Sequence, residues 1–478
     1  MKKGLILGLA GAALLAACSP DSLTVPNPNS PKLNEASADP GAVQFIATGI
    51  TRQLRGSAGG LITASARFGR EGYIYTPNEG RNTSHYLIGV PGANKLDPSG
   101  FTAAVGWNAQ YGNLRDLYNF RGIVNAQPVT TLNATQKSAA LGWARTLEAL
   151  ELLYVISYKD SIGAPVQIMD DPQTLAPYVS RDSVYRYILG TLDQADTELA
   201  AGGAAFPFVL HTGFAGFTTP TSFRLFNRAI KARAAVYYAT RGGGAPAYAT
   251  AAAALTASFL NLGATNAAGL DAGPFHPYST STGDATNGVG QNNDFLGHPS
   301  NATDIAAGDL RSAKWVTIAS RGAPGSPTFG IPTTLRIARY ATNVANVPII
   351  RNEELILLDA EVKWFTNTNK VGAIANLNQV RSISGGAGIG ATAATAASSD
   401  AVFTDALLYE RRFSLFAEGH RWIDHRRFGR LAALPLDLTS ANTTEPNNYH
   451  FVARVIPTSQ AECLSRVGAG AGLAAPDC

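Results

Sequence analysis

The densest group of side chains that could carry out chemistry lies near the C-terminus, between Tyr409 and Arg427. Carboxylates, guanidinium groups and imidazoles follow one another closely there: Glu410, Arg411, Glu418, His420, Arg421, Asp424, His425 and Arg426. Imidazoles and carboxylates are ligands of many metal ions and serve as acids and bases in many enzymes. The two histidines, however, are five residues apart, which places them on different faces of a helix. The spacing therefore does not favour a metal site.

The element that positions these charges is predicted to be a helix. Tyr409, Phe413 and Phe416 recur at helical spacing and would form one apolar face. Acids and bases on neighbouring turns can then pair with each other. Charges set between large apolar residues predict a partly buried ionic network, which is stable only when every member has a partner. We expect a helix from Glu410 to Arg427 whose charges hold the structure together.

Other catalytic patterns are weak in this sequence. The run from Gly385 to Gly390 resembles a phosphate-binding loop, but it follows an expected helix rather than a strand, and no Lys-Ser or Lys-Thr comes after it. The sequence contains neither a G-x-S-x-G nor an H-E-x-x-H motif. We therefore expect no catalytic residues, no metal and no cofactor.

Two long stretches show no helical periodicity, from about residue 56 to 99 and from about residue 263 to 348. Long irregular segments in a compact protein are usually functional. Rings can stack on the C–H faces of sugars, while amides and carboxylates bond the hydroxyl groups. The alternative for any single ring is that it packs its loop onto the helices. The candidate ligand residues are Tyr73, Tyr75, Phe275, Tyr278, Asn292, Asn293, Asp294 and Trp315.

Helical periodicity dominates the rest of the chain. Ser180 is of a type that caps helix N-termini, and Gly242 to Gly244 would end a helix. Successive helices of this kind suggest an array of stacked helix pairs, although no repeat of about 34 residues is evident. The expected helices run from about residue 136 to 160, after residue 180, from 223 to 237, from 247 to 260 and after residue 352.

The first residues have the composition of a secretion signal. Met1-Lys2-Lys3 is basic, and residues 4–17 form an apolar run that is too short to span a bilayer. The run ends in Leu15-Ala16-Ala17-Cys18, which resembles a bacterial lipobox and would make Cys18 the lipidated N-terminus of the mature chain. Several acyl chains anchor a protein stably. Residues 18–40, rich in Pro, Asn, Ser and Asp, would form a flexible tether.

Cysteine content and charge add two expectations. Apart from Cys18 the chain contains only Cys463 and Cys478, and in an exported protein a disulfide between them is favoured over two free thiols. Closing a loop of about 15 residues stabilises by roughly 3 kcal/mol in the chain-entropy model. The formal net charge of +4 over 478 residues is small and its Lys and Arg residues are scattered, so nucleic-acid binding has no support.

Three ordered segments resemble the C-terminal signature of the SusD/RagB family of outer-membrane nutrient-binding lipoproteins. Residues 351–361 resemble the family's R-x-x-E-x-x-L-x-x-A-E helix, and residues 377–381 resemble its L-N-x-V-R helix end. Residues 410–427 contain its E-R-R, L-F, E-G-H-R-W and R-R elements in order. The resemblance implies a structural role for Arg351, Glu354, Glu361, Arg381, Glu410, Arg411, Glu418, Gly419, Arg421 and Asp424.

The resemblance also implies a fold and a function. The fold would be mainly α-helical, a SusD-like superhelix of four divergent tetratricopeptide-type helix pairs with an irregular, loop-rich subdomain. A signal peptide (1–17) and a lipidated tether (18–40) would precede the SusD-like domain (41–478), whose signature occupies about residues 351–460.

A protein of this family is expected on the outer membrane, facing the cell exterior. It would bind an oligosaccharide or a peptide and act as the lid of a SusC-like TonB-dependent transporter. Two alternatives stay open: a lipid-anchored helical scaffold of the envelope, and a surface glycan hydrolase that uses acidic residues of the irregular loops.

Overall fold

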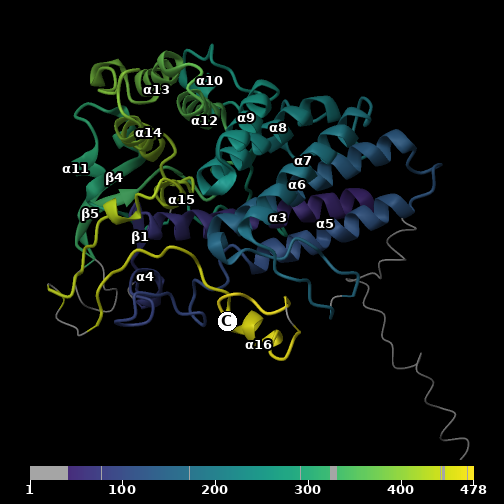
Figure 1. Ribbon diagram of the computed structural model, residues 1–478, viewed down its shortest axis with the longest axis horizontal. Coiled ribbons are helices and arrows are strands. Elements are labelled where there is room, and N and C mark those ends of the chain that lie inside the picture. Colours follow the sequence, from purple (N-terminus) through teal and green to yellow (C-terminus); the bar gives the residue numbers. More distant parts are fainter. Residues whose placement is uncertain are drawn as a thin grey trace, which may run out of the picture.

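The computed structural model describes residues 41–478, apart from residues 77, 172, 291, 323–330, 442, 444–446 and 471. The expected signal peptide, Cys18 and the tether therefore lie outside the described residues. Helices make up most of the regular structure, so the prediction of a mainly α-helical fold is confirmed (Figure 1). Within the described ranges, no helix combines the length and hydrophobicity that a bilayer crossing requires.

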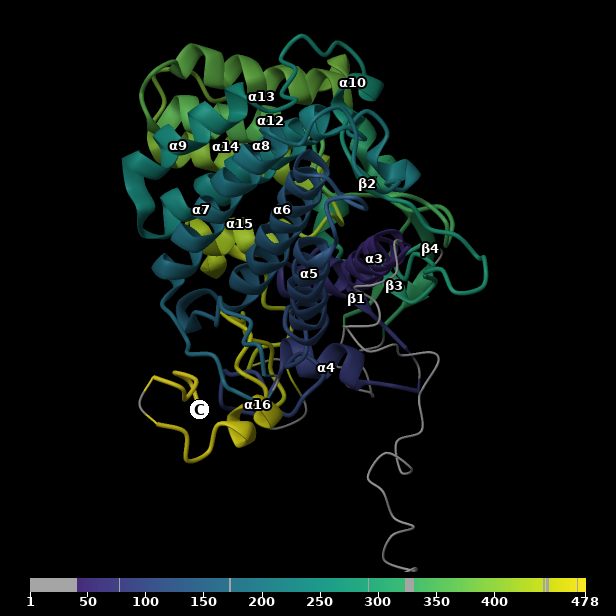
Figure 2. The same ribbon diagram turned by 90° about the vertical axis from the view of Figure 1, so that its right-hand side faces the viewer.

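The long helices form an array in which neighbours in the sequence pack against one another (Figures 1 and 2). The chain runs from α5 to α6, α7, α8 and α9 through successive contacts, and α12 contacts both α13 and α14. The bounds of the helices are α3 Ala42–Phe68, α4 Arg81–Leu87, α5 Asn108–Ala126, α6 Ala134–Lys159, α7 Arg181–Ala200, α8 Pro220–Tyr238, α9 Gly244–Thr256, α10 Ala267–Asp271, α11 Ser300–Asp304, α12 Asn352–Phe365, α13 Lys370–Ser384, α14 Asp400–Ser414, α15 Arg421–Arg427 and α16 Gln460–Ser465.

Local sequence signals explain where several of these helices begin. Ser180 caps α7 as predicted, because its side chain accepts a hydrogen bond from the backbone N–H of Ser183. Asn133 forms a capping box with Gln136 at the start of α6. Thr219 caps α8, whose first residue is Pro220, a residue whose fixed φ suits that position.

A small sheet lies beside the helical array (Figure 2). Its strands are antiparallel and follow the order β1-β3-β5-β4. A separate two-stranded pair joins β2 to β6. The strands are β1 Gly72–Ile74, β2 Phe275–His276, β3 Phe295–Gly297, β4 Trp315–Arg321, β5 Thr333–Ile337 and β6 Val347–Pro348. All of these strands fall within the two stretches expected to be irregular.

The first of those stretches is shorter than predicted. Residues 56–68 were expected to be irregular, but they continue α3. The glycines in Gly56-Ser57-Ala58-Gly59-Gly60 hide the helical period in the sequence. Tertiary packing offsets the low helix propensity of glycine, because Leu61 and Ile62 just beyond this run are buried.

The expectation of one helix from Glu410 to Arg427 is wrong. The chain leaves α14 after Ser414 and starts α15 at Arg421, with left-handed backbone at Ala417 (φ 56°) and Gly419 (φ 90°). Buried partners hold this turn: the hydroxyl of Tyr340 donates to the carbonyl of Ala417 (3.2 Å). The turn points successive side chains in directions that one helix could not provide.

The C-terminal segment returns across the N-terminal half of the molecule (Figure 1). Nη2 of Arg70 donates to the carbonyl of Phe451 (2.8 Å), and Nζ of Lys159 donates to that of Pro457 (2.6 Å). Both cationic side chains are fully buried. Cys463 and Cys478 form a disulfide that closes the loop beyond this segment.

Candidate functional site

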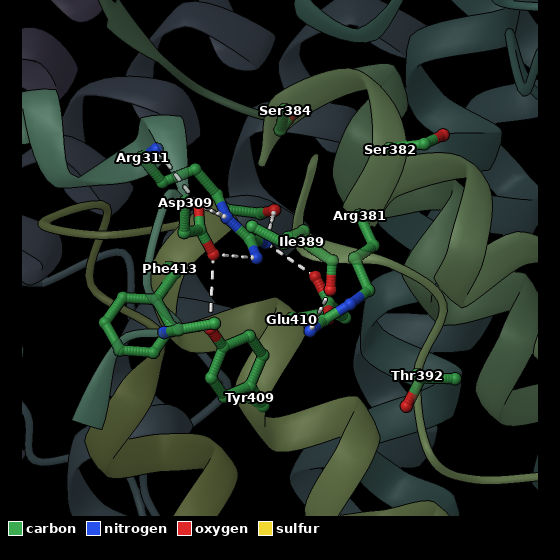
Figure 3. A network of polar contacts seen from close by, with 12 residues as sticks. Asp309, Arg311, Arg381, Ser382, Ser384, Ile389, Thr392, Tyr409, Glu410 and Phe413 are labelled. Carbon is green, nitrogen blue, oxygen red and sulfur yellow. Dashed lines mark hydrogen bonds and ion pairs between the residues drawn. The ribbon is translucent and has the colours of Figure 1, made fainter. Parts of the chain in front are cut away.

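The family-signature residues form buried ion pairs. Figure 3 shows the part built around Glu410 of α14, whose carboxylate accepts hydrogen bonds from Arg311 (2.6 Å) and from Arg381 of α13 (2.7 Å). Arg311 lies in the 3-10 helix Leu310–Lys314 and also contacts Asp309 (2.7 Å). The hydroxyl of Tyr409 donates to the same aspartate (3.1 Å). The cluster therefore joins three segments that are distant in the sequence.

A second part of the network surrounds Arg351. Its guanidinium contacts both oxygens of Glu418 (3.0 and 3.1 Å), the carboxylate of Glu353 and the carbonyl of Ser414 (2.7 Å). Burial alone would raise the pKa of Glu418, but the guanidinium groups of Arg351 and Arg339 outweigh it and lower that pKa to about 2. Glu418 is therefore ionised at any physiological pH.

A third part links α14, α15 and α12 through Asp424. One oxygen of Asp424 accepts from Arg411 (2.7 Å) and the other from Arg427 (2.8 Å). Arg427 also binds Glu361 with two hydrogen bonds (2.5 and 2.7 Å). Burial opposes ionisation of Asp424, yet Arg411 and Arg427 lower its pKa to about 2. The acids and bases on these helices are thus held to one another.

Two further signature residues use other partners. Glu354 pairs with Arg233 of α8, with a contact of 2.7 Å from Nε. Arg421 donates to the backbone carbonyl of Arg70 (3.0 Å). His420 lies between these groups, its Nδ1 3.1 Å from the hydroxyl of Tyr237, and burial lowers its pKa to about 4. A neutral, buried imidazole of this kind belongs to the packing.

Four aromatic residues among the candidate ligand residues are buried. Tyr73 donates its hydroxyl to Asp437, and Tyr75 donates its own to the carbonyl of Ile331 (3.1 Å). The hydroxyl of Tyr278 donates to the carbonyl of Arg55 (2.9 Å). These rings offer no free face in this conformation, which matches the alternative that they pack loops onto helices.

Trp315 is also directed into the protein. Only 8% of the residue is exposed, and its ring packs edge-on against that of Phe416, with centroids 5.4 Å apart. Phe416 follows the end of α14, so Trp315 packs β4 against the turn between α14 and α15. Phe275, in β2, is half-buried.

Two of the three polar candidates, Asn292 and Asn293, line an open groove, here called the sheet groove. It has a volume of about 370 Å³ and is lined by Asn292, Asn293, Arg336, Ile337, Ala338, Tyr340 and Ala341. Nη1 of Arg336 donates to the side-chain oxygen of Asn293, and the side chain of Asn292 accepts from the N–H of Asp294 (3.0 Å). Nη2 of Arg321 in β4 binds the carboxylate of Asp294 (2.7 Å).

The sequence did not single out the two arginines of this region. Arg336 lies between Leu335 and Ile337 in β5, whose side chains alternate between buried and exposed, and Arg321 ends β4. The apolar alternation in Thr333–Ile337 would have predicted an outward-facing Arg336. Amide, carboxylate and guanidinium groups here provide both donors and acceptors for a polar ligand.

The arrangement of stacked helices with a small sheet on one side, fastened by a buried ionic signature, defines a SusD-like helical-repeat protein. The model of the SusD family matches residues 329–463, which include most of that signature. The resemblance recognised in the sequence is therefore confirmed for this C-terminal region. A search of curated proteins finds no match.

Solved structures share this fold over almost their whole length. The surface glycan-binding protein A from Bacteroides fluxus is 16% identical, with a TM-score of 0.63, and the match covers 90% of this chain and 98% of that one. A SusD-like carbohydrate binding protein from Bacteroides vulgatus is 14% identical, with a TM-score of 0.60 and coverage of 91% and 97%. B. fragilis NanU is 12% identical, with a TM-score of 0.61 and coverage of 89% and 96%.

Proposed function

We propose that this protein is a lipid-anchored nutrient-binding protein of the outer-membrane surface, and that its ligand is an oligosaccharide. One observation carries the proposal. The C-terminal region matches the SusD family, and the fold of the chain matches solved SusD-like proteins over nearly their full length. Two of those proteins are described as glycan-binding or carbohydrate-binding. The proposal extends that property to this chain.

The sheet groove is the proposed ligand site. Sugars present hydroxyl groups that both donate and accept hydrogen bonds, and Asn293 with Arg336 offers a carbonyl, an amide and a guanidinium within one opening. Asn293 is exposed, whereas the signature residues Arg351, Arg411 and Arg421 are buried. Asn292, Asn293 and Asp294 therefore remain candidate ligand residues, and Arg336 joins them.

Anchoring and delivery follow from the sequence resemblance. Cys18 would carry the lipid, residues 18–40 would form the tether, and the domain would face the cell exterior. A SusC-like TonB-dependent transporter would be the partner, with this chain as its lid. Transport energy would reach the complex through the transporter, so the chain itself would carry out no catalysis and need no cofactor.

Two linked measurements test the proposal on the full-length lipoprotein. Affinity purification from solubilised outer membranes should recover a TonB-dependent transporter in a stable ratio. A screen of soluble glycans and peptides should then find a ligand, and Arg336→Ala and Asn293→Ala should each weaken its binding. Recovery without a transporter, together with no ligand in the screen, would favour an envelope scaffold, while turnover of a glycan would favour a hydrolase.

A further inference from the structure

A second groove lies on the helical side of the molecule and shares no described lining residue with the sheet groove. It is here called the helix groove and has a volume of about 430 Å³, within the range of about 300–1,000 Å³ typical of small-molecule sites. Its walls come from the π-helix Ala239–Gly243, α9, the end of α12, the start of α14 and the segment after α15. The residues that the argument uses are Thr240, Tyr248, Phe365, Asp400, Phe428 and Arg430.

Aromatic rings form the floor of the helix groove. Phe365 and Phe428 are half-buried, with ring centroids 6.0 Å apart and planes tilted by 34°. Phe365 stacks on Tyr248, at 5.7 Å and 14°. Rings fixed in this way present apolar faces at the bottom of a solvent-accessible groove, which the buried rings near the sheet groove do not.

The floor is held rigid from within. The guanidinium of Arg427 lies 4.2 Å from the ring centroid of Phe428, and that arginine is itself fixed by Glu361 and Asp424. The hydroxyl of Tyr248 donates to Glu361 as well (3.0 Å). Arg427 is buried and also lines the groove, so its guanidinium covers one face of the phenylalanine ring and leaves the other to a ligand. A ring held in place before binding loses little entropy when a ligand stacks on it.

Charged groups of both signs stand at the rim. Asp400, the first residue of α14, has a side chain that is 70% exposed, and one of its oxygens accepts from the indole N–H of Trp364 (2.9 Å). Arg430 lies 3.4 Å from Asp405, and both of these side chains are partly open to solvent. Exposed pairs of this kind are weak, so the guanidinium can turn toward a ligand at small cost.

The backbone is distorted at the same groove. α8 passes into a π-helix at Ala239–Gly243, where Arg241 and Gly242 leave helical geometry (φ −115° and 129°). π-helical turns are rare and occur frequently at functional sites. The wider turn brings Thr240 to the wall of the groove.

We propose that the helix groove binds one hexopyranose unit of a glycan, as a saccharide site separate from the sheet groove. One face of the sugar stacks on Phe428 and Phe365, and its hydroxyl groups bond the carboxylate of Asp400 and the guanidinium of Arg430. A phosphorylated ligand would meet the carboxylate of Asp400, and a wholly apolar ligand would take both charges out of water and offer them no hydrogen bond in exchange. A neutral sugar, with an apolar face and a polar edge, satisfies every group.

This inference rests on the proposed glycan-binding function and adds a consequence for affinity. When a long glycan has bound one site, its binding to the second site on the same protein is intramolecular. The apparent affinity for the long glycan then exceeds the affinity of either site alone. The helix groove should therefore matter more for a polysaccharide than for a short fragment of it.

The test uses the full-length lipoprotein in detergent with four methyl pyranosides, those of glucose, galactose, mannose and xylose, observed by saturation-transfer NMR. At least one should bind, and Phe428→Ala should weaken that binding by about tenfold. Asp400→Asn and Arg430→Gln should also weaken it. These two substitutions alter exposed polar groups, so they keep the test decisive if Phe428→Ala fails to fold. Arg224→Ala is the matched control and should leave this signal in place, because Arg224 pairs with Asp196 on the surface (2.8 Å) and lines neither groove.

Each outcome separates this inference from the proposed function. If a glycan binds and Arg336→Ala abolishes binding while the three helix-groove variants behave like the unsubstituted protein, the helix groove is no saccharide site and the proposed function stands. Absence of binding for all four pyranosides, or their displacement only by an aromatic or proline-containing peptide, also overturns the inference. Loss of signal in the three variants with full retention in Arg224→Ala establishes it.

Discussion

Arg351 and Arg336 both bind side-chain oxygens, yet their surroundings differ in every other respect. Arg351 has a side chain that is 3% exposed, and it contacts Glu418, Glu353 and a backbone carbonyl. Arg336 lies in the open sheet groove, where Nη1 of its guanidinium donates to the side-chain oxygen of Asn293. The same functional group therefore holds the fold together in one region and remains available to a ligand in the other.

The contrast shows how to interpret a charged cluster. Removing an ion from water costs several kcal/mol, roughly, so a buried charge persists only when partners offset that cost. The residues from Glu410 to Arg427 look like an active site in the sequence because they are dense in acids and bases, but most of their charges are held in buried ion pairs, and Arg421 donates to the carbonyl of Arg70. The sheet groove has fewer charges and leaves them accessible.

Lowering the pH should cause the largest loss of stability, through the acids of the buried network. The pKa of Glu418 and that of Asp424 are both about 2 in the folded protein, below their ordinary values of 4.5 and 3.8. An acid whose folded pKa is lowered contributes stability that is complete above its unfolded pKa and is lost as the pH falls through the folded pKa. Each carboxylate should contribute on the order of 2–3 kcal/mol.

Chemical denaturation at steps between pH 6 and pH 2 measures this effect. The free energy of unfolding should fall mainly between about pH 4.5 and pH 2. Glu418→Gln should flatten the lower part of the profile, since its amide does not titrate. A profile that stays level to pH 2 would contradict the assignment of these two acids to the network.

Arg351→Ala should lower the free energy of unfolding by about 3–5 kcal/mol, because it leaves Glu418 and Glu353 buried with fewer partners. The matched control is Arg186→Ala, since Arg186 pairs with Asp182 on the surface and both side chains are well exposed. That control should cost less than about 1 kcal/mol. Thermal or denaturant unfolding of the two variants side by side makes the comparison, and equal losses would refute the distinction by burial.

Trp315→Ala should also destabilise, by about 3–5 kcal/mol, because it opens a cavity between β4 and Phe416. Affinity of the folded fraction for a ligand of the sheet groove should stay the same, measured by titration calorimetry at a temperature where the variant is folded. Weaker binding without a change in stability would return Trp315 to the ligand site. That result would contradict the distinction between the buried network and the sheet groove.

Arg336→Ala should give the smallest change in stability, about 1 kcal/mol or less, because the side chain is only half-buried and its hydrogen-bond partner Asn293 is exposed. Its effect should appear in ligand binding, weakened by about tenfold through loss of a charged hydrogen bond. Unfolding and binding measured on the same preparation separate the two quantities. A large loss of stability would place Arg336 with the buried arginines.

Several long helices could be predicted because their apolar period reflects the packing that forms them, whereas α3, interrupted by glycines in the sequence, could not. Ser180 and the periodic residues of α6 and α8 gave correct positions, since capping and periodicity are local properties. The break between α14 and α15 could not be predicted from local signals. It depends on a distant residue, Tyr340, that binds the turn.

The proposed ligand site could be predicted only in part. Asn292, Asn293 and Asp294 precede β3 and line or border the sheet groove, as polar loop residues often do. Tyr73 and Trp315 look the same in sequence as exposed platforms would, and only the fold shows that their rings point inward. Burial of a ring is a property of the whole structure, which composition does not report.

The returning C-terminal segment has a consequence for the order of folding. A chain is made from its N-terminus, so α3 and α6 are complete long before residues 451–457 exist. Until then the guanidinium of Arg70 and the ammonium of Lys159 lack the carbonyls of Phe451 and Pro457 and stay hydrated. The first half of the molecule can therefore close fully only when the last residues arrive, and a chain cut short before Phe451 should remain open to proteases.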